Sequence, residues 1–178
     1  MKIIKFLNKK NIFSQRGVTV VELLLYMAIL SVLLTILTSV FISALDVQSE
    51  SNASSSVEQD GNYIIARLAY DMHRANSINF PASDGATSTD NFQIIINAVN
   101  YKYSVDSNNN LILTVSSVPN NLNGYGSSIS NFSVLRLGNG VGKIEDTLKI
   151  NFTVTSRTKR QSGYEIKDFE TNLSLRRQ

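Results

Sequence analysis

The sequence predicts an α+β fold, in which one long N-terminal helix is followed by an antiparallel β-sheet. Residues 18–45 are almost wholly apolar, and a helical spacing of apolar residues returns over 57–75. From Phe92 onward, short stretches rich in β-branched and aromatic residues alternate with Gly- and Asn-containing turns. Strands that follow a helix without alternating with further helices are typical of α+β domains.

The stretch from Val18 to Leu45 is predicted to be a membrane-spanning helix. These 28 residues contain one charged side chain, Glu22. A helix of this length measures about 42 Å, whereas about 20 apolar residues cross a bilayer core. The preceding segment, 1–17, has no acidic residue and carries five basic ones, which are Lys2, Lys5, Lys9, Lys10 and Arg16. The positive-inside rule therefore predicts a cytoplasmic N-terminus and an extracytoplasmic C-terminal part.

Glu22 is the unusual residue of this stretch. An acidic residue inside a membrane-spanning helix costs about 2.5–3.5 kcal/mol on insertion scales, so such residues are usually paired. We therefore expect Glu22 to have a cationic partner. A secretory signal, which would release a soluble β-domain enzyme, fits less well, because its apolar part is about 7–15 residues long and its cleavage site follows that part. Here the small residue at a boundary is Gly17, which precedes the apolar stretch.

The residues around Gly17 carry a family resemblance. The segment Gln15-Arg16-Gly17-Val18-Thr19-Val20-Val21-Glu22-Leu23 resembles the cleavage and methylation signature of type IV prepilins and type II secretion pseudopilins. The resemblance implies that prepilin peptidase cuts after Gly17 and methylates the new amine of Val18. It also implies that Glu22 attracts the N-terminal amine of a neighbouring subunit during filament assembly.

The family's architecture, a long helix packed on an antiparallel sheet, agrees with the fold predicted above. Two features depart from the common pattern of the family. Val18 stands where Phe is commoner, and no Pro interrupts the apolar stretch, which favours a minor pilin or pseudopilin over a major pilus subunit. Two other stretches, Tyr63–Ser77 and Val99–Tyr103 with the turn that leads to Leu111, resemble the J-type minor pseudopilins. The implied partners are the peptidase, other pilin or pseudopilin subunits bound through the N-terminal helix, and the filament assembly platform.

Four segments are expected. They are a prepilin leader peptide (1–17), a transmembrane half of the helix (18–45), an amphipathic half (46–78) and an extracytoplasmic β-sheet head (79–178). Within the amphipathic half Arg67 and Asp71 are spaced as an ion pair, and Gly61 is expected to be a weak point costing about 1 kcal/mol relative to Ala. The helix is predicted to end near Asn76 and Ser77, ahead of Phe80-Pro81.

Small hydroxyl residues share one face of the apolar stretch, namely Ser31, Thr35, Thr38, Ser39 and Ser43. They are suited either to close packing against other membrane helices or to bonding their own backbone. In the head, strands are predicted at 92–98, 99–105, 111–118, 129–137, 147–156 and 164–175, with a turn at 106–110.

The charge of the chain argues against nucleic-acid binding. The sequence has 17 basic and 14 acidic residues, and five of the basic ones lie in 1–17, which leaves 12 against 14 in residues 18–178. The processed chain would thus carry a net charge of −2 from its side chains. Nothing in this balance favours capture of DNA, although a local basic patch could form from Arg157, Lys159, Arg160, Arg176 and Arg177.

Candidates for chemistry are few. The sequence has no Cys and a single His, His73, which we interpret as a residue of the helix surface. Asp106-Ser107-Asn108-Asn109-Asn110 has the first spacings of a calcium loop, but it lacks the Gly and the bidentate Glu that complete one. We interpret it as a hairpin turn, and we assign no calcium site to Asp84 and Asp90. No catalytic residue, metal site or cofactor is predicted.

The sequence therefore favours a structural, non-enzymatic subunit of a type IV pilus-like filament that serves secretion, pilus biogenesis or DNA uptake. Its expected location is the cytoplasmic (inner) membrane as a single-pass protein, and then a filament in the periplasm or at the cell surface. The alternative is a single-pass membrane-anchored extracytoplasmic binding protein that forms no filament.

Overall fold

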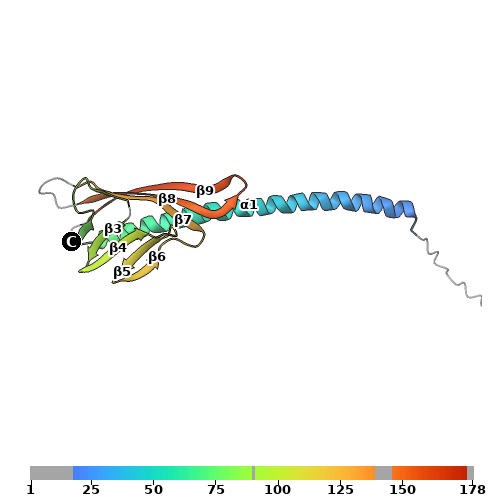
Figure 1. Ribbon diagram of the computed structural model, residues 1–178. Helices are drawn as coiled ribbons and strands as arrows, with labels where there is room; N and C mark the ends of the chain where they lie inside the picture. The colour runs from blue at the N-terminus through green and yellow to red at the C-terminus, as the bar shows by residue number, and fades with distance from the viewer. Residues whose placement is uncertain (1–17, 90, 139–145, 176–178) are drawn as a thin grey trace, which may run out of the picture. The chain divides into compact units, whose positions relative to one another are not determined.

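The computed structural model describes residues 18–89, 91–138 and 146–175 (Figure 1). The chain divides after Ser43 into two compact units, and one helix, α1 (Val20–Arg74), contributes to both. All strands of the described ranges lie in the second unit, which begins at Ala44. The architecture is thus a long N-terminal helix with antiparallel sheets, which confirms the predicted α+β class.

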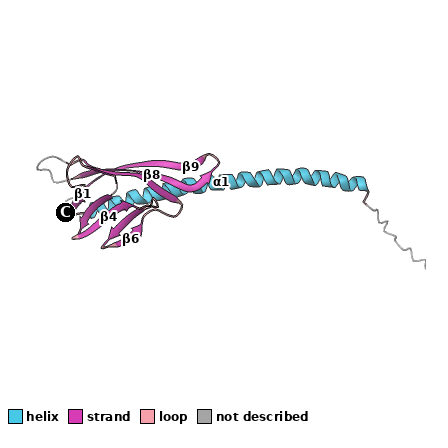
Figure 2. Cartoon of the chain, viewed as in Figure 1, coloured by secondary structure: helices cyan, strands magenta, loops and turns pink. Residues whose placement is uncertain are grey.

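Two antiparallel sheets form the head (Figure 2). The five-stranded sheet has the order β1-β3-β4-β5-β6 and contains β1 (Ser77–Phe80), β3 (Asn91–Ile96), β4 (Val99–Val105), β5 (Leu111–Val115) and β6 (Val118–Asn121). The four-stranded sheet has the order β2-β7-β8-β9 and contains β2 (Thr87–Ser88), β7 (Ser127–Arg136), β8 (Thr147–Arg160) and β9 (Gly163–Ser174).

Alternation of side chains explains the strands. In β3 the apolar residues Phe92, Ile94 and Ile96 are buried, and the residues between them are only partly buried. Strand β8 repeats this pattern from Leu148 to Phe152. Because successive side chains of a strand point to opposite faces, each sheet gains one apolar face for the core.

The second half of α1 supplies the helical side of the core. Val57, Ile64, Leu68 and Met72 recur at helical spacing and are at most 1% exposed. They form one apolar cluster with residues of both sheets, including Phe92 and Phe152, which are the large aromatic side chains of β3 and β8. The helix therefore holds the two sheets in a single hydrophobic core.

Several boundaries differ from the sequence prediction. Helix α1 ends at Arg74, because Asn76 donates its backbone N–H to Ile95 O (2.8 Å) and starts the approach to β1. Strands β1, β2 and β6 were not predicted. The expected strand at 111–118 is two strands, since Ser116 and Ser117 adopt positive φ angles of 50° and 69° and form a two-residue hairpin turn.

Strand β9 is an edge strand. It pairs with β8 over its whole length, and no other described strand follows it in the sheet. Its exposed side chains include Lys167, Asp168 and Glu170, and Glu165 is half-buried. Phe169, in contrast, points inward and stacks on Phe152 with a distance of 5.4 Å between ring centroids.

Candidate functional site

The first turn of α1 is capped by the side chain of Thr19, a residue of the predicted signature. Thr19 precedes the helix, and its Oγ1 accepts a hydrogen bond from the backbone N–H of Glu22 (3.2 Å). Thr19 O accepts the next one from the backbone N–H of Leu23 (3.1 Å). This is the Thr side of a capping box, in which a Glu stands three residues after the cap. The Thr-x-x-Glu spacing was present in the sequence and predicts where the helix begins.

Glu22 thus lies in the first turn of an apolar helix. Negative charge is favoured there, because the unpaired N–H groups of a helix start carry partial positive charge. Tyr26, one turn further on, donates its hydroxyl to Glu22 Oε1 (2.7 Å). Among the described residues no cationic side chain contacts Glu22. The cationic partner that we expected is therefore not supplied by the described part of the chain.

Of the other predicted processing residues, Val18 is described and Gly17 is not. Val18 lies just before Thr19 and is exposed. Gly17, on the other side of the expected cleavage point, lies outside the described residues, as does the rest of the expected leader. Val18 therefore begins the described chain four residues before Glu22, which is about one helical turn.

No described part of the chain covers the apolar stretch. From Val18 to Leu45 the large apolar side chains are 46–76% exposed. Within the described residues, α1 is the helix long and apolar enough to cross a membrane. Continuous apolar exposure on this scale marks contact with lipid or with other proteins, because water would leave it unstable.

The hydroxyl residues of this stretch bond their own helix. Thr35 donates to Ser31 O (2.9 Å), Thr38 to Leu34 O (2.8 Å) and Ser43 to Ser39 O (2.9 Å). Ser31 and Ser39 do likewise. Of the two roles left open by the sequence, the structure therefore shows the local one, in which each hydroxyl satisfies its own backbone.

The head contains a buried polar cluster that sequence reasoning missed. Asp71 is fully buried, and its Oδ2 accepts hydrogen bonds from Arg67 Nε (2.8 Å) and from the Tyr103 hydroxyl of β4. The Arg67–Asp71 pair was predicted from its spacing, and it is confirmed. Burial and the bond to Asp71 raise the pKa of Tyr103 well above its usual value. Burial acts to lower the pKa of Arg67, but the hydrogen bond and charge of Asp71 outweigh it and raise that pKa.

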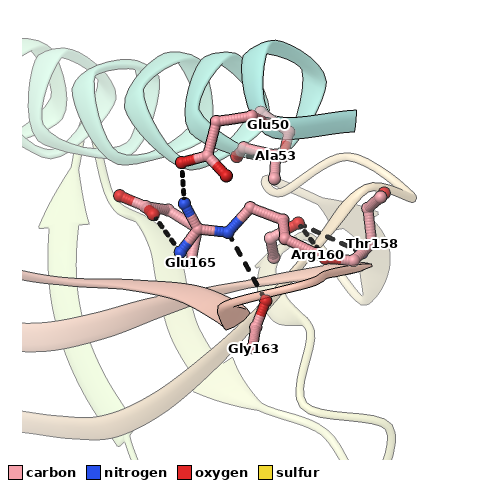
Figure 3. A network of polar contacts seen from close by, with 8 residues as sticks. Glu50, Ala53, Thr158, Arg160, Gly163 and Glu165 are labelled. Carbon is pink, nitrogen blue, oxygen red and sulfur yellow. Dashed lines mark hydrogen bonds and ion pairs between the residues drawn. The ribbon is translucent and has the colours of Figure 1, made fainter. Parts of the chain in front are cut away.

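Arg160 links the β8–β9 hairpin to the helix (Figure 3). Its guanidinium pairs with Glu50 of α1 through Nη1 and with Glu165 of β9 through Nη2 (2.7 Å), and Nε donates to Gly163 O (3.4 Å). Its side chain is only 13% exposed. The local basic patch is thus partly neutralised at Arg160 by acidic partners, which gives that residue a structural role.

The remaining candidates have ordinary structural roles. His73 is exposed on the last turn of α1, as we interpreted it. Asp106 Oδ1 accepts the backbone N–H groups of Asn108 (2.9 Å) and Asn110 (2.7 Å) and closes the hairpin turn that the sequence predicts. Asp84 pairs with Arg136 (3.5 Å). Asp90, Arg176 and Arg177 lie outside the described residues.

Comparison with known proteins gives one match. Residues 12–38 match the family described as the prokaryotic N-terminal methylation motif. The matched segment contains Gly17, Val18 and Glu22 and extends into the apolar half of α1. No curated protein and no solved structure matches the chain significantly.

These findings define a class of protein. The described part of the chain has one N-terminal helix that is long and apolar enough to cross a membrane, and an α+β head. The methylation motif overlaps the start of that helix. This combination supports a membrane-anchored subunit of the prepilin or pseudopilin type. The family match covers residues 12–38 and does not reach the head, so what is known of the head comes from its structure.

Proposed function

We propose that the chain is a minor pilin or pseudopilin subunit. Prepilin peptidase would cut it after Gly17 and methylate the amine of Val18, and the processed chain would join a type IV pilus-like filament. The observation that carries this proposal is the coincidence of the methylation motif at 12–38 with the start of a bare apolar helix whose first turn holds Glu22.

The chemistry of cleavage fits the residues at the junction. Gly17 has no side chain, so it presents no steric barrier to a protease that grips extended backbone. Hydrolysis of the Gly17–Val18 bond would leave a cationic amine on Val18, about one turn ahead of Glu22. Removal of 1–17 would also remove the five basic residues and change the charge of the membrane-proximal end.

The role of Glu22 follows from its environment. A carboxylate in lipid needs a cation, and the described part of the chain offers it only the Tyr26 hydroxyl. The methylated amine of a neighbouring subunit would supply that cation. In a low dielectric the attraction between the two charges offsets part of the desolvation cost of both. Glu22 would therefore select a processed neighbour.

The proposed partners and location follow from this assembly. The N-terminal helices of other subunits, the peptidase and the assembly platform are the protein partners. The proposed location is the cytoplasmic membrane, with the N-terminus in the cytoplasm and the head outside, before entry into the filament. The uninterrupted apolar stretch supports a minor subunit over a major one, and the resemblance of Tyr63–Ser77 and Val99–Tyr103 is the reason to propose the J-type kind.

Mass spectrometry of the N-terminus tests processing. The full chain is isolated from the membranes of its host, and the expected N-terminal peptide begins at Val18 and carries one N-methyl group. A matched sample from a strain without the peptidase should begin at Met1. Recovery of intact Met1 from the wild-type strain would refute the processing step.

A substitution at Glu22 tests assembly separately. Glu22→Ala should leave cleavage after Gly17 intact and should remove the chain from sheared filaments. Thr38→Ala, within the same apolar stretch, is the matched control and should leave both unchanged. Incorporation of the Glu22→Ala chain at the wild-type level would refute the role of Glu22 in assembly. Absence of the wild-type chain itself from sheared filaments would favour the alternative, a membrane-anchored binding protein without a filament.

A further inference from the structure

A polar cleft lies in the head, away from the methylation motif. It has a volume of about 490 Å³ and is lined by four asparagines, Asn108, Asn110, Asn121 and Asn123, together with Tyr125 and Arg157. Its walls come from the β4–β5 turn, the end of β6 with the β6–β7 loop, and β8. No carboxylate is among the described residues that line it. Its size falls in the range of small-molecule sites.

Hydrogen bonds connect two of the asparagines that line the cleft, Asn110 and Asn123, to neighbouring segments. Asn123 Oδ1 accepts the backbone N–H of Leu111 (2.8 Å), and Asn123 Nδ2 donates to Ser127 O (3.1 Å). Asn110 donates through Nδ2 to Asp106 Oδ2 (3.1 Å) and accepts from Arg157 Nη2 (2.9 Å). Both amides therefore take part in holding the two loops together.

The β6–β7 loop is also tied to the helix. Asp60 of α1 accepts hydrogen bonds at Oδ2 from the backbone N–H of Gly124 (2.9 Å) and from Ser127 Oγ (2.5 Å). These bonds flank Tyr125, so the backbone that carries this ring is fixed. A fixed site loses little conformational freedom when it binds a ligand.

The rim carries unused groups. The side-chain amides of Asn108 and Asn121 make no hydrogen bond within the described chain, and both residues are exposed. Tyr125 is 96% exposed, with its ring in solvent. Arg157 donates hydrogen bonds through Nη2 to Asn108 O and Asn110 Oδ1. Its Nε and Nη1 remain available to a ligand.

These groups point to one ligand chemistry. A planar amide offers a donor and an acceptor side by side, which matches neighbouring hydroxyl groups on a ring. An exposed aromatic ring offers a flat apolar surface for the C–H face of such a ring. A guanidinium prefers a carboxylate. We propose that this cleft, the asparagine cleft, binds an acidic sugar, a hydroxyl-rich ring that bears a carboxylate.

Other ligand classes fit the cleft less well. A nucleic acid needs a track of basic residues along its backbone, and Arg157 is the one basic residue among those that line the cleft. A divalent cation needs carboxylate or several convergent carbonyl oxygens, and here two of the four amides are already engaged. The proposal is independent of whether the chain is cleaved after Gly17.

Saturation-transfer NMR on the ligand tests the proposal. The full chain is purified in a zwitterionic detergent without a sugar headgroup. The probes are trigalacturonate, a hyaluronan tetrasaccharide and N-acetylmuramic acid, with maltotriose as the neutral comparison. At least one acidic probe should receive saturation and bind about tenfold more tightly than maltotriose, which corresponds to about 1.4 kcal/mol. An absence of transfer to all three acidic probes would overturn the proposal.

Three variants locate the binding. Tyr125→Ala should abolish the transfer without affecting folding, because the ring is almost fully exposed. Arg157→Gln should remove the preference for the acidic probe, and Tyr164→Ala, at an exposed tyrosine of β9, should change nothing. Binding that survives Tyr125→Ala would overturn the proposal. So would tighter binding of an oligodeoxythymidylate that displaces the sugar, because the cleft would then be a nucleic-acid site.

Discussion

Phe169 of β9 lies directly against Gly61 of α1. A Cβ atom on Gly61 would come within 2.0 Å of Phe169 Cζ and within 2.4 Å of Cε2. The ring is 8% exposed and stacks on Phe152. From the sequence, Gly61 was expected to be a weak point of the helix. In the structure Gly61 is needed for packing, since the absence of a side chain lets Phe169 of β9 lie against the helix.

Gly61→Ala is therefore expected to destabilise the head, although Ala is the better helix former by about 1 kcal/mol. The added methyl group must displace the Phe169 ring from a packed core, and overpacking typically costs about 1–3 kcal/mol. Asn62→Ala, at the exposed neighbouring position, is the matched control. It should raise the midpoint temperature of unfolding slightly, because Ala is a better helix former than Asn. Thermal unfolding by circular dichroism measures both, and a Gly61→Ala chain more stable than the Asn62→Ala chain would contradict this account.

Tyr103 should make the head sensitive to alkali. Its folded pKa is raised by burial and by its bond to Asp71, whereas in the unfolded chain it titrates near 10. Above pH of about 10 the unfolded chain releases this proton and the folded chain retains it, so stability falls as pH rises. Chemical denaturation between pH 8 and 11, values chosen to bracket the unfolded pKa of about 10, should show this loss in the wild type.

Tyr103→Phe is the matched variant for that measurement. It removes the hydroxyl and leaves buried Asp71 with Arg67 alone, so it should cost about 1–3 kcal/mol at neutral pH. It should also flatten the alkaline fall in stability. An equally steep fall in the variant would show that another group is responsible.

Arg160 should control local opening of the β8–β9 hairpin. Glu50→Gln weakens one of its two ion pairs, and because Glu50 is 54% exposed the expected loss of global stability is small, about 0.2–1 kcal/mol. Hydrogen exchange at the hairpin tip, residues 158–164, should nevertheless become faster. Glu58→Gln weakens the separate pair with Lys167 and serves as the control, with no effect at the tip.

Asp106 should make the head less stable at acidic pH. The backbone N–H of Asn110 and the other donors of the turn hold the pKa of Asp106 below its usual value. The contribution of the Asp106 carboxylate to folding stability is thus complete above pH of about 4, the pKa in the unfolded chain. It is lost as the pH falls through the lower pKa that Asp106 has in the folded chain. Asp106→Asn keeps the turn geometry and should lose this pH dependence. NMR titration of Asp106 in the wild type checks the direction of the shift.

Sequence patterns predicted the elements whose signals are local. The apolar stretch from Val18, the apolar stripe of the second half of α1 and the alternation in β3 and β8 each reflect one face of one element. The Arg67–Asp71 pair is also local, because the two residues are four positions apart on one helix. These features need no knowledge of the rest of the fold.

The missed features depend on distant residues. Asp71 was predicted to pair with Arg67, but its burial depends on Tyr103, 32 residues later, which supplies a second hydrogen-bond donor. Arg160 meets Glu50 across 110 residues, and the asparagine cleft forms only when two Asn-rich loops meet. Strand β6 contains Pro119 and has an entirely exposed pattern, so neither alternation nor propensity marks it. Pairing with β5 defines it instead.

The charged side chains on the unpaired edge of β9 should affect whether heads aggregate at high local concentration. An unpaired strand edge is a template onto which another chain can add, and twelve residues give a long one. Lys167 and Asp168 stand next to each other on it, and Glu165 and Glu170 lie close by. A second copy of β9 laid antiparallel along this border would bring many of these ions out of water. Crowded heads should therefore resist amyloid-like growth, and neutral substitutions at these positions would be the ones that promote it.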